Sequence, residues 1–199
     1  MKSNITVHVG YPKCGSSFLQ NIIFPRITDV YFFDKYVHLF SRFNNGDKVL
    51  ISNENIVGEP LQELTFKYFA DIIINRYNSP NIILIRRNKA SLIYSYYCEL
   101  VMNGMNMRFN KFINNYKDAF VDFLDYDKVI GYYKDHGCNV LVLDFEDLQK
   151  DNKNFVNCIC NFINVDTPDY ENIVVRKKKT RFGINCRVIT NKLFDKLKL

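Results

Sequence analysis

The stretch GYPKCGSS, residues 10–17, follows the apolar run ITVHV at residues 5–9. Two glycines five residues apart, followed by hydroxyl residues, form the skeleton of a phosphate-binding loop between a strand and a helix. In the Walker A pattern, G-x-x-x-x-G-K-[ST], the lysine follows the second glycine. Here Ser16 holds that place, and the lysine lies inside the loop as Lys13. The stretch therefore predicts a strand, an anion-binding loop and a helix.

The residue types in this loop suit an anion. Gly10 and Gly15 let the backbone turn and present its N–H groups to a ligand. A helix that starts after Gly15 points its positive end at the same place, and Ser16 and Ser17 add hydroxyl donors. The alternative is a plain glycine turn in which Ser16 only caps the helix.

Short runs rich in Val, Ile and Leu alternate with helical stretches along the rest of the chain. The expected strands are residues 5–9, 30–33, 48–52, 81–86 and 139–145. The expected helices are residues 16–24, 61–77, 89–102, 109–124, 126–135, 151–163 and 187–197. This alternation favours an α/β fold, a three-layer P-loop-type domain with a central, mostly parallel sheet flanked by helices. Ligands of such folds bind at the carboxyl ends of the strands.

The composition describes one globular domain. The chain has 199 residues, of which 47% are hydrophobic and 24% charged, and no repeat or linker is visible. We therefore expect a single domain over residues 1–199, in which residues 176–199 form a basic loop and a helix. The net charge of +6 fits an anionic ligand, although nucleic acid or anionic lipid would fit it as well.

Six cysteines are scattered along the chain, and they predict reduced thiols rather than a metal site. They are Cys14, Cys98, Cys138, Cys158, Cys160 and Cys186. No C-x-x-C pair occurs, and no histidine lies near Cys158 and Cys160, so a zinc site is not expected. We also expect no signal peptide and no transmembrane segment, and hence a cytoplasmic protein.

A second stretch, ILIRRNKASLIYSYY at residues 83–97, starts as a strand and continues as a helix. Arg87 stands at the end of the strand, and Ser95 follows eight residues later. If this strand neighbours the first one, Arg87 lies beside the loop. The alternative is a solvated arginine pair at a helix N-terminus.

Together these stretches resemble the sulfotransferases that use 3′-phosphoadenosine 5′-phosphosulfate (PAPS). YPKCGSSFLQ is similar to their P-K-x-G-[ST]-[ST] loop, and RNKASLIYSYY to their R-[ND]-P-x-[DE]-x-x-x-S-Y-Y segment. LVLDFEDL, residues 141–148, is similar to a later strand that reads V-x-x-Y-E-D-L. The three blocks come in the family's order.

The departures from the family pattern indicate a branch. Lys89 replaces the usual proline of the second block, and the C-terminal R-K-G-x-x-G loop of the cytosolic branch is matched only loosely by VRKKKTRFG at residues 175–183. The chain is also short. It therefore resembles the compact bacterial, viral or carbohydrate-type sulfotransferases more than the cytosolic phenol branch.

The resemblance implies a role for each motif. Lys13 would contact the 5′-phosphosulfate and neutralise charge on the bridging oxygen as the bond to sulfur breaks. Arg87 and Ser95 would hold the 3′-phosphate of PAPS and of the product 3′-phosphoadenosine 5′-phosphate (PAP). No metal is expected. The donor-binding residues of the loop would be Pro12, Lys13, Cys14, Gly15, Ser16, Ser17 and Phe18.

The acceptor hydroxyl must lose a proton, so a general base is expected. Glu54 follows the strand at residues 48–52, and carbohydrate-type sulfotransferases use a glutamate in a comparable place. His38, among aromatic residues, is the alternative, because the cytosolic branch uses a histidine. Each has a simpler interpretation: Glu54 as a solvated loop carboxylate or helix cap, and His38 as a packed side chain. We favour Glu54.

Two further features have competing interpretations. Cys14 lies near a helix N-terminus, which would lower its pKa and make it reactive, unless the loop merely tolerates a small residue there. The basic stretch at residues 176–187 would close over the donor through Arg176, Lys177 and Arg181, bind an anionic acceptor or a membrane surface, or form an ordinary solvated face. We favour the first.

The resemblance suggests a small-molecule or glycan hydroxyl as the acceptor, by branch a carbohydrate or glycolipid, and no nucleic acid. Two other functions remain open. A small-molecule kinase would use Asp144 as a metal ligand and require ATP and magnesium. A non-catalytic module would bind a phosphorylated ligand without turnover. The sequence predicts no oligomeric state.

Overall fold

The structure is a computed structural model that describes residues 4–44, 46–62, 64–171, 183–185, 187–189 and 191–192. Its centre is a parallel sheet with the strand order β2-β3-β1-β6-β7. These strands are β1 (Ile5–His8), β2 (Tyr31–Phe33), β3 (Val49–Ser52), β6 (Asn81–Arg86) and β7 (Asn139–Asp144). The five strands expected from the sequence are all present, and the sheet is the one expected for an α/β domain.

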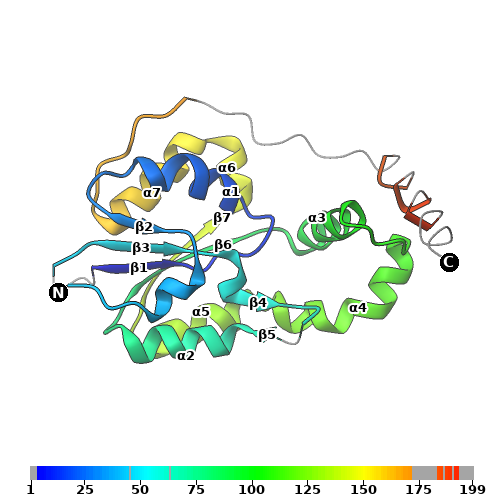
Figure 1. Cartoon of the computed structure of the whole chain (residues 1–199), viewed down its shortest axis with the longest axis horizontal. Helices are drawn as coiled ribbons and strands as arrows, with labels where there is room; N and C mark the ends of the chain where they lie inside the picture. Colours follow the sequence, from blue (N-terminus) through cyan, green and yellow to red (C-terminus); the bar gives the residue numbers. More distant parts are fainter. Residues whose placement is uncertain are drawn as a thin grey trace.

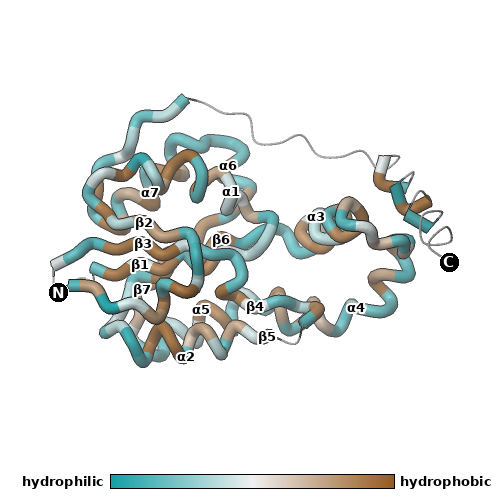
Figure 2. The backbone as a smooth tube through the Cα atoms, in the orientation of Figure 1, coloured by the Kyte–Doolittle hydropathy of each residue, from teal (hydrophilic) through white to brown (hydrophobic). Residues whose placement is uncertain are grey.

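The three inner strands are apolar because they are covered on both faces. All four residues of β3 are buried, as are three of four in β1 and five of six in β6. Figure 2 shows these strands as the hydrophobic centre of the molecule. Parallel strands between two helical layers are expected to be this uniformly apolar.

Helices cover both faces of the sheet (Figure 1). The helices α1, α6 and α7 lie on one face and α2 and α5 on the other, while α3 and α4 extend beyond the carboxyl ends of the strands. Their bounds are α1 (Ser16–Phe18), α2 (Phe66–Arg76), α3 (Lys89–Met102), α4 (Phe109–Phe123), α5 (Tyr126–Asp135), α6 (Phe145–Lys150) and α7 (Asn152–Ile163). Side-chain caps fix several starts, including Asn88 for α3, Asp125 for α5 and Asp151 for α7.

Three expected boundaries were wrong. The helix expected at residues 16–24 is α-helical only over Ser16–Phe18 and continues as a π-helical turn, Leu19–Ile23, and a 3-10 turn, Phe24–Arg26. The helix expected from residue 61 begins at Phe66, because β4 (Gly58–Glu59) and β5 (Leu64–Thr65) pair as a small antiparallel hairpin just before it. The strand expected at residues 139–145 ends at Asp144, and α6, which the sequence did not predict, begins at Phe145.

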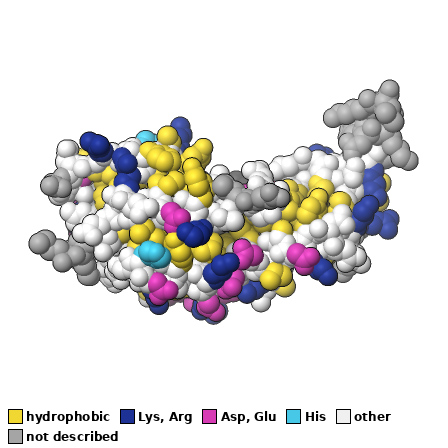
Figure 3. Space-filling model, turned by 90° about the horizontal axis from the view of Figure 1, so that it is seen from below, with side chains coloured by type: hydrophobic (Ala, Val, Ile, Leu, Met, Phe, Trp, Pro, Cys, Tyr) yellow, Lys and Arg dark blue, Asp and Glu magenta, His cyan; other side chains and the backbone are white. Residues whose placement is uncertain are grey.

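The surface mixes side-chain types. On the face seen in Figure 3, basic and acidic side chains are interspersed with hydrophobic ones. The exposed apolar side chains include Tyr31, Tyr36, Val37, Phe40 and Tyr68. Within the described residues, no helix is both long enough and apolar enough to cross a bilayer.

The described residues near the C-terminus pack on the end of α3. Ile184 and Val188 are buried. The side-chain amide of Asn191 donates to the backbone oxygens of Val101 and Met105, at 2.8 and 2.9 Å. The predicted donor contacts Arg176, Lys177 and Arg181 lie outside the described residues.

Candidate functional site

The loop after β1 has a backbone that turns twice through the left-handed region. Lys13 has a φ of 65° and Gly15 a φ of 88°. For a lysine this conformation costs on the order of 1–3 kcal/mol, so neighbouring contacts must hold it. Arg87 Nη1 supplies one such contact, because it donates to the backbone oxygen of Lys13 at 2.6 Å.

Arg87 is thus a buried brace of the loop. It is only 8% exposed, its Nε donates to Ser91 Oγ at 3.0 Å, and its guanidinium lies 4.6 Å from the centre of the Phe145 ring. Since β1 and β6 are neighbours in the sheet, the expectation that Arg87 lies beside the loop is confirmed.

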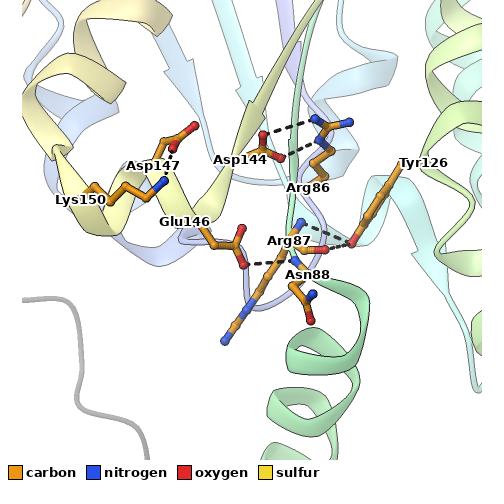
Figure 4. A network of polar contacts seen from close by, with 8 residues as sticks. All are labelled: Arg86, Arg87, Asn88, Tyr126, Asp144, Glu146, Asp147 and Lys150. Carbon is orange, nitrogen blue, oxygen red and sulfur yellow. Dashed lines mark hydrogen bonds and ion pairs between the residues drawn. The ribbon is translucent and has the colours of Figure 1, made fainter.

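The neighbouring arginine, Arg86, contacts β7 and not the loop. Arg86 makes two hydrogen bonds to the carboxylate of Asp144, at 2.6 and 3.3 Å. Figure 4 shows Arg86 turned toward Asp144 and Arg87 turned the other way, as expected for consecutive residues of an extended strand. Asp144, the metal ligand in the kinase alternative, is therefore engaged by an arginine.

The space under the loop is tight. A Cβ on Gly10 would lie 2.6 Å from His8 Nε2 and 3.1 Å from Ser16 Oγ. A Cβ on Gly15 would lie 2.6 Å from Leu148 Cδ2. Both glycines are therefore needed for space, and Gly15 also for its left-handed backbone.

Three buried side-chain polar atoms lack a hydrogen-bond partner within the described residues, and all belong to the end of β1 and the loop. They are His8 Nε2, Tyr11 Oη and Ser16 Oγ. Buried polar atoms are normally paired. Ser16 is 2% exposed, and its hydroxyl lies beside Gly10, in the loop that the sequence predicts to bind an anion.

Glu54 lies beside the loop, just after β3. Burial raises the pKa of its carboxyl, Lys13 opposes that rise, and Glu99 and Glu59 add to it. The nearby Ser16 hydroxyl also lowers the pKa of Glu54, without reaching the geometry of an ordinary hydrogen bond. A carboxyl with a raised pKa next to a lysine is suited to accept a proton.

Two further carboxylates surround this pair. Glu99 Oε1 lies 2.5 Å from Lys13 Nζ, and Glu59 accepts a hydrogen bond from the hydroxyl of Tyr96. Glu99 and Glu59 thus each have a partner, and Glu54 is the carboxylate that faces both Lys13 and Ser16.

The other predicted site residues lie as follows. Ser17 is exposed, and Pro12 is half-buried. Phe18 is buried and packs edge-on against Tyr170. Ser95 lies on α3, one turn after Ser91. His38 stacks on Phe33 with ring centres 4.4 Å apart, the packing expected if it is an ordinary aromatic neighbour.

Of the two interpretations of Cys14, the small residue tolerated by the loop is confirmed, and the lowered thiol pKa is not. The side chain is fully buried, and burial raises the pKa of the thiol while Arg87 only partly opposes that rise. Cys14 is therefore a small packed residue, and only its backbone can face a ligand.

Sequence reasoning missed Ser91, Glu99 and Phe145. A signal for the first two was present, because Ser91, Ser95 and Glu99 are spaced four residues apart and so share one face of α3. Ser91 contacts Arg87 and Glu99 contacts Lys13, so this face runs along the loop.

Comparison with known proteins identifies the family. The model of the sulfotransferase domain family matches residues 5–182. The chain belongs to the sulfotransferase family. It is accordingly an α/β enzyme of the sulfotransferase family, as the three sequence blocks indicated.

Solved structures agree in fold. A sulfotransferase from Alicyclobacillus acidocaldarius is 17% identical with a TM-score of 0.67, covering 96% of this chain and 94% of its own. Mouse sulfotransferase SULT7A1 complexed with PAP is 16% identical with a TM-score of 0.56, covering 98% of this chain and 66% of its own. No curated protein matches the chain.

Proposed function

We propose that this sulfotransferase moves the sulfuryl group of PAPS to a hydroxyl group of a carbohydrate or glycolipid. The mouse relative is complexed with PAP, which supports PAP as the nucleotide product here. The glutamate beside the loop supports a carbohydrate acceptor, because the resemblance to the carbohydrate-type branch includes a glutamate base.

The observation that supports the proposal is that Ser16, Lys13 and Glu54 lie close together beside the loop. Ser16 brings a buried hydroxyl without a hydrogen-bond partner, and Lys13 brings a cation from the same loop. Lys13 and Ser16 suit an anionic donor, and Glu54 suits the hydroxyl group that reacts with it.

In the proposed reaction the acceptor oxygen bonds to sulfur as the bond from sulfur to the bridging oxygen breaks. Lys13 stabilises the negative charge that develops on that oxygen of the leaving PAP. Glu54 takes the proton from the acceptor hydroxyl. Gly15, Ser16 and Ser17 hold the 5′-phosphate through N–H and hydroxyl groups.

The 3′-phosphate is assigned to Arg87 and Ser95. Arg87 already uses Nε and Nη1 for Ser91 and the loop, and a guanidinium has five N–H donors. It therefore has donors to spare for a phosphate. Ser95 follows Ser91 on the same face of α3, at a position suited to a second contact.

The test is a thermal-shift titration with PAP, adenosine 5′-phosphate and ATP with magnesium. A ligand that binds only the native state raises the apparent stability as its concentration passes Kd. The proposal expects a selective shift with PAP, because only PAP carries both phosphates. A shift with ATP and magnesium alone would contradict it.

The acceptor is tested separately, by incubating the enzyme with PAPS and a panel of hydroxyl compounds. The panel holds oligosaccharides, a glycolipid, a phenol and a steroid, and sulfated product is detected by mass spectrometry. We expect product with the sugar compounds. Turnover restricted to the phenol or the steroid would contradict the assigned acceptor while leaving the donor site intact.

A further inference from the structure

Glu99 contacts the central lysine of the site but belongs to none of the sequence blocks quoted above. Its carboxylate oxygen lies 2.5 Å from Lys13 Nζ, and the side chains are 45% and 27% exposed. Three turns of α3 separate Glu99 from the start of the helix at Lys89, so a rigid element fixes its place.

The charges around Lys13 indicate that its contact with Glu99 does more than form a surface ion pair. The charges of Lys13, Glu99 and Glu59 all act on the Glu54 carboxyl, and the charge of Glu99 raises the pKa of Glu54. An ammonium group has three donors, so Lys13 can keep Glu99 while it contacts a donor oxygen. An anionic donor at Lys13 would then stand next to the Glu99 carboxylate, and the two like charges would repel each other.

We infer that Glu99 is a positioning residue of the transfer reaction, which acts through Lys13. Its carboxylate orients the lysine ammonium beside Glu54 and opposes the binding of the anionic donor. The inference rests on the proposed function, since it takes Lys13 as the residue that contacts the donor. It predicts opposite effects on donor affinity and on turnover, which a purely structural role would not produce.

The effect on pH follows from the groups that face Glu54. These are Lys13 from the loop, Glu99 from α3, Glu59 from β4 and the Ser16 hydroxyl from α1. Loss of the Glu99 charge removes one group that raises the pKa of Glu54. The base then stays ionised to lower pH, and the acidic limb of the rate profile moves to lower pH.

The test compares Glu99→Gln with the wild-type enzyme. For Glu99→Gln we expect PAP to bind about threefold to tenfold more tightly, as befits the loss of one partly exposed charge. We expect kcat to fall several-fold and the acidic limb to shift downward. Glu99→Asp, which keeps the charge on a shorter side chain, should recover wild-type PAP affinity and part of kcat.

Two controls make the result specific. Asp122→Asn makes the same carboxylate-to-amide change at an exposed pair with Lys128 on another part of the surface, and should alter neither PAP affinity nor kcat. In a Lys13→Ala background, Glu99→Gln should no longer lower kcat, because Glu99 acts through the lysine.

The outcomes separate this inference from the proposed function. If the wild-type protein does not bind PAP, the proposed function fails. If it binds PAP but Glu99→Gln leaves Kd and kcat unchanged, or if the two substitutions lower kcat additively, the role of Glu99 is overturned and the proposed function stands.

Discussion

Lys13 combines a strained backbone with the side chain to which we assign the contact with the sulfuryl donor. Its φ of 65° is held by Arg87 from the neighbouring strand, and its ammonium meets Glu99. Non-glycine residues in such conformations are common at functional sites, where surrounding contacts overcome their cost. The lysine that departs from the Walker A pattern is therefore placed by the tertiary structure.

The first prediction concerns this side chain. Lys13→Ala should lower kcat/KM by roughly 10²-fold or more, since electrostatic groups at developing charge commonly contribute several kcal/mol. The melting temperature should change little, because the lysine is partly exposed and its backbone contact to Arg87 remains. Steady-state kinetics and calorimetry measure the two effects. Near-normal turnover would remove Lys13 from the reaction.

At the scale of elements, α6 packs against the loop at Gly15. Leu148 and Phe145 of this helix lie against Gly15, and Phe145 also lies under the Arg87 guanidinium. The family block LVLDFEDL therefore does more than supply a strand, because its second half forms the wall on which the loop rests.

The second prediction tests this wall. Gly15→Ala places a Cβ 2.6 Å from Leu148 at a φ of 88°, and should destabilise the fold by about 1–3 kcal/mol and weaken PAP binding. Gly131→Ala is a matched control in α5, where a new Cβ meets nothing within 4 Å. It should raise stability by roughly 0.5–1 kcal/mol. Urea unfolding of both variants measures this, and equal effects would contradict the packing argument.

Elements were predictable from sequence where the pattern was local. The strand at residues 81–86 and α3 at residues 89–102 were recognised because a long apolar run and a helical pattern decide them. The hairpin of β4 and β5 was missed, because each strand is two residues long and depends on pairing. The four-residue spacing of Ser91 and Glu99 shows that they share a face of α3, but only the strand order, with β6 beside β1, shows that this face meets the loop.

At the scale of the whole molecule, His8 links the loop at residues 10–17 to global stability. It is completely buried, its Nδ1 lies 2.7 Å from Ser52 Oγ, and Gln20 donates to the same hydroxyl at 3.1 Å. Burial lowers the pKa of His8 from 6.5 to about 4. The folded protein therefore holds a neutral imidazole against Gly10, directly beneath this loop.

The third prediction follows from that pKa. As the pH falls below 6.5, His8 becomes protonated in the unfolded chain, whereas in the folded chain it stays neutral down to about pH 4. The contribution of His8 to the free energy of unfolding is thus fully present above pH 6.5. It falls by about 3 kcal/mol as the pH drops to about 4. His8→Asn, which does not titrate, should show a smaller loss of unfolding free energy over this range. Urea titrations at several pH values would measure it, and parallel curves would contradict the assignment.

The contact between Gly10 and His8 also has an evolutionary consequence. The two residues are two positions apart in the chain, and the imidazole of His8 fills the space that a side chain at residue 10 would need. A methyl group on residue 10 would overlap the imidazole. A descendant of this chain could enlarge residue 10 only after residue 8 became smaller. In an alignment of related chains, these two positions should therefore change together, and a glycine at position 10 should accompany every large side chain at position 8.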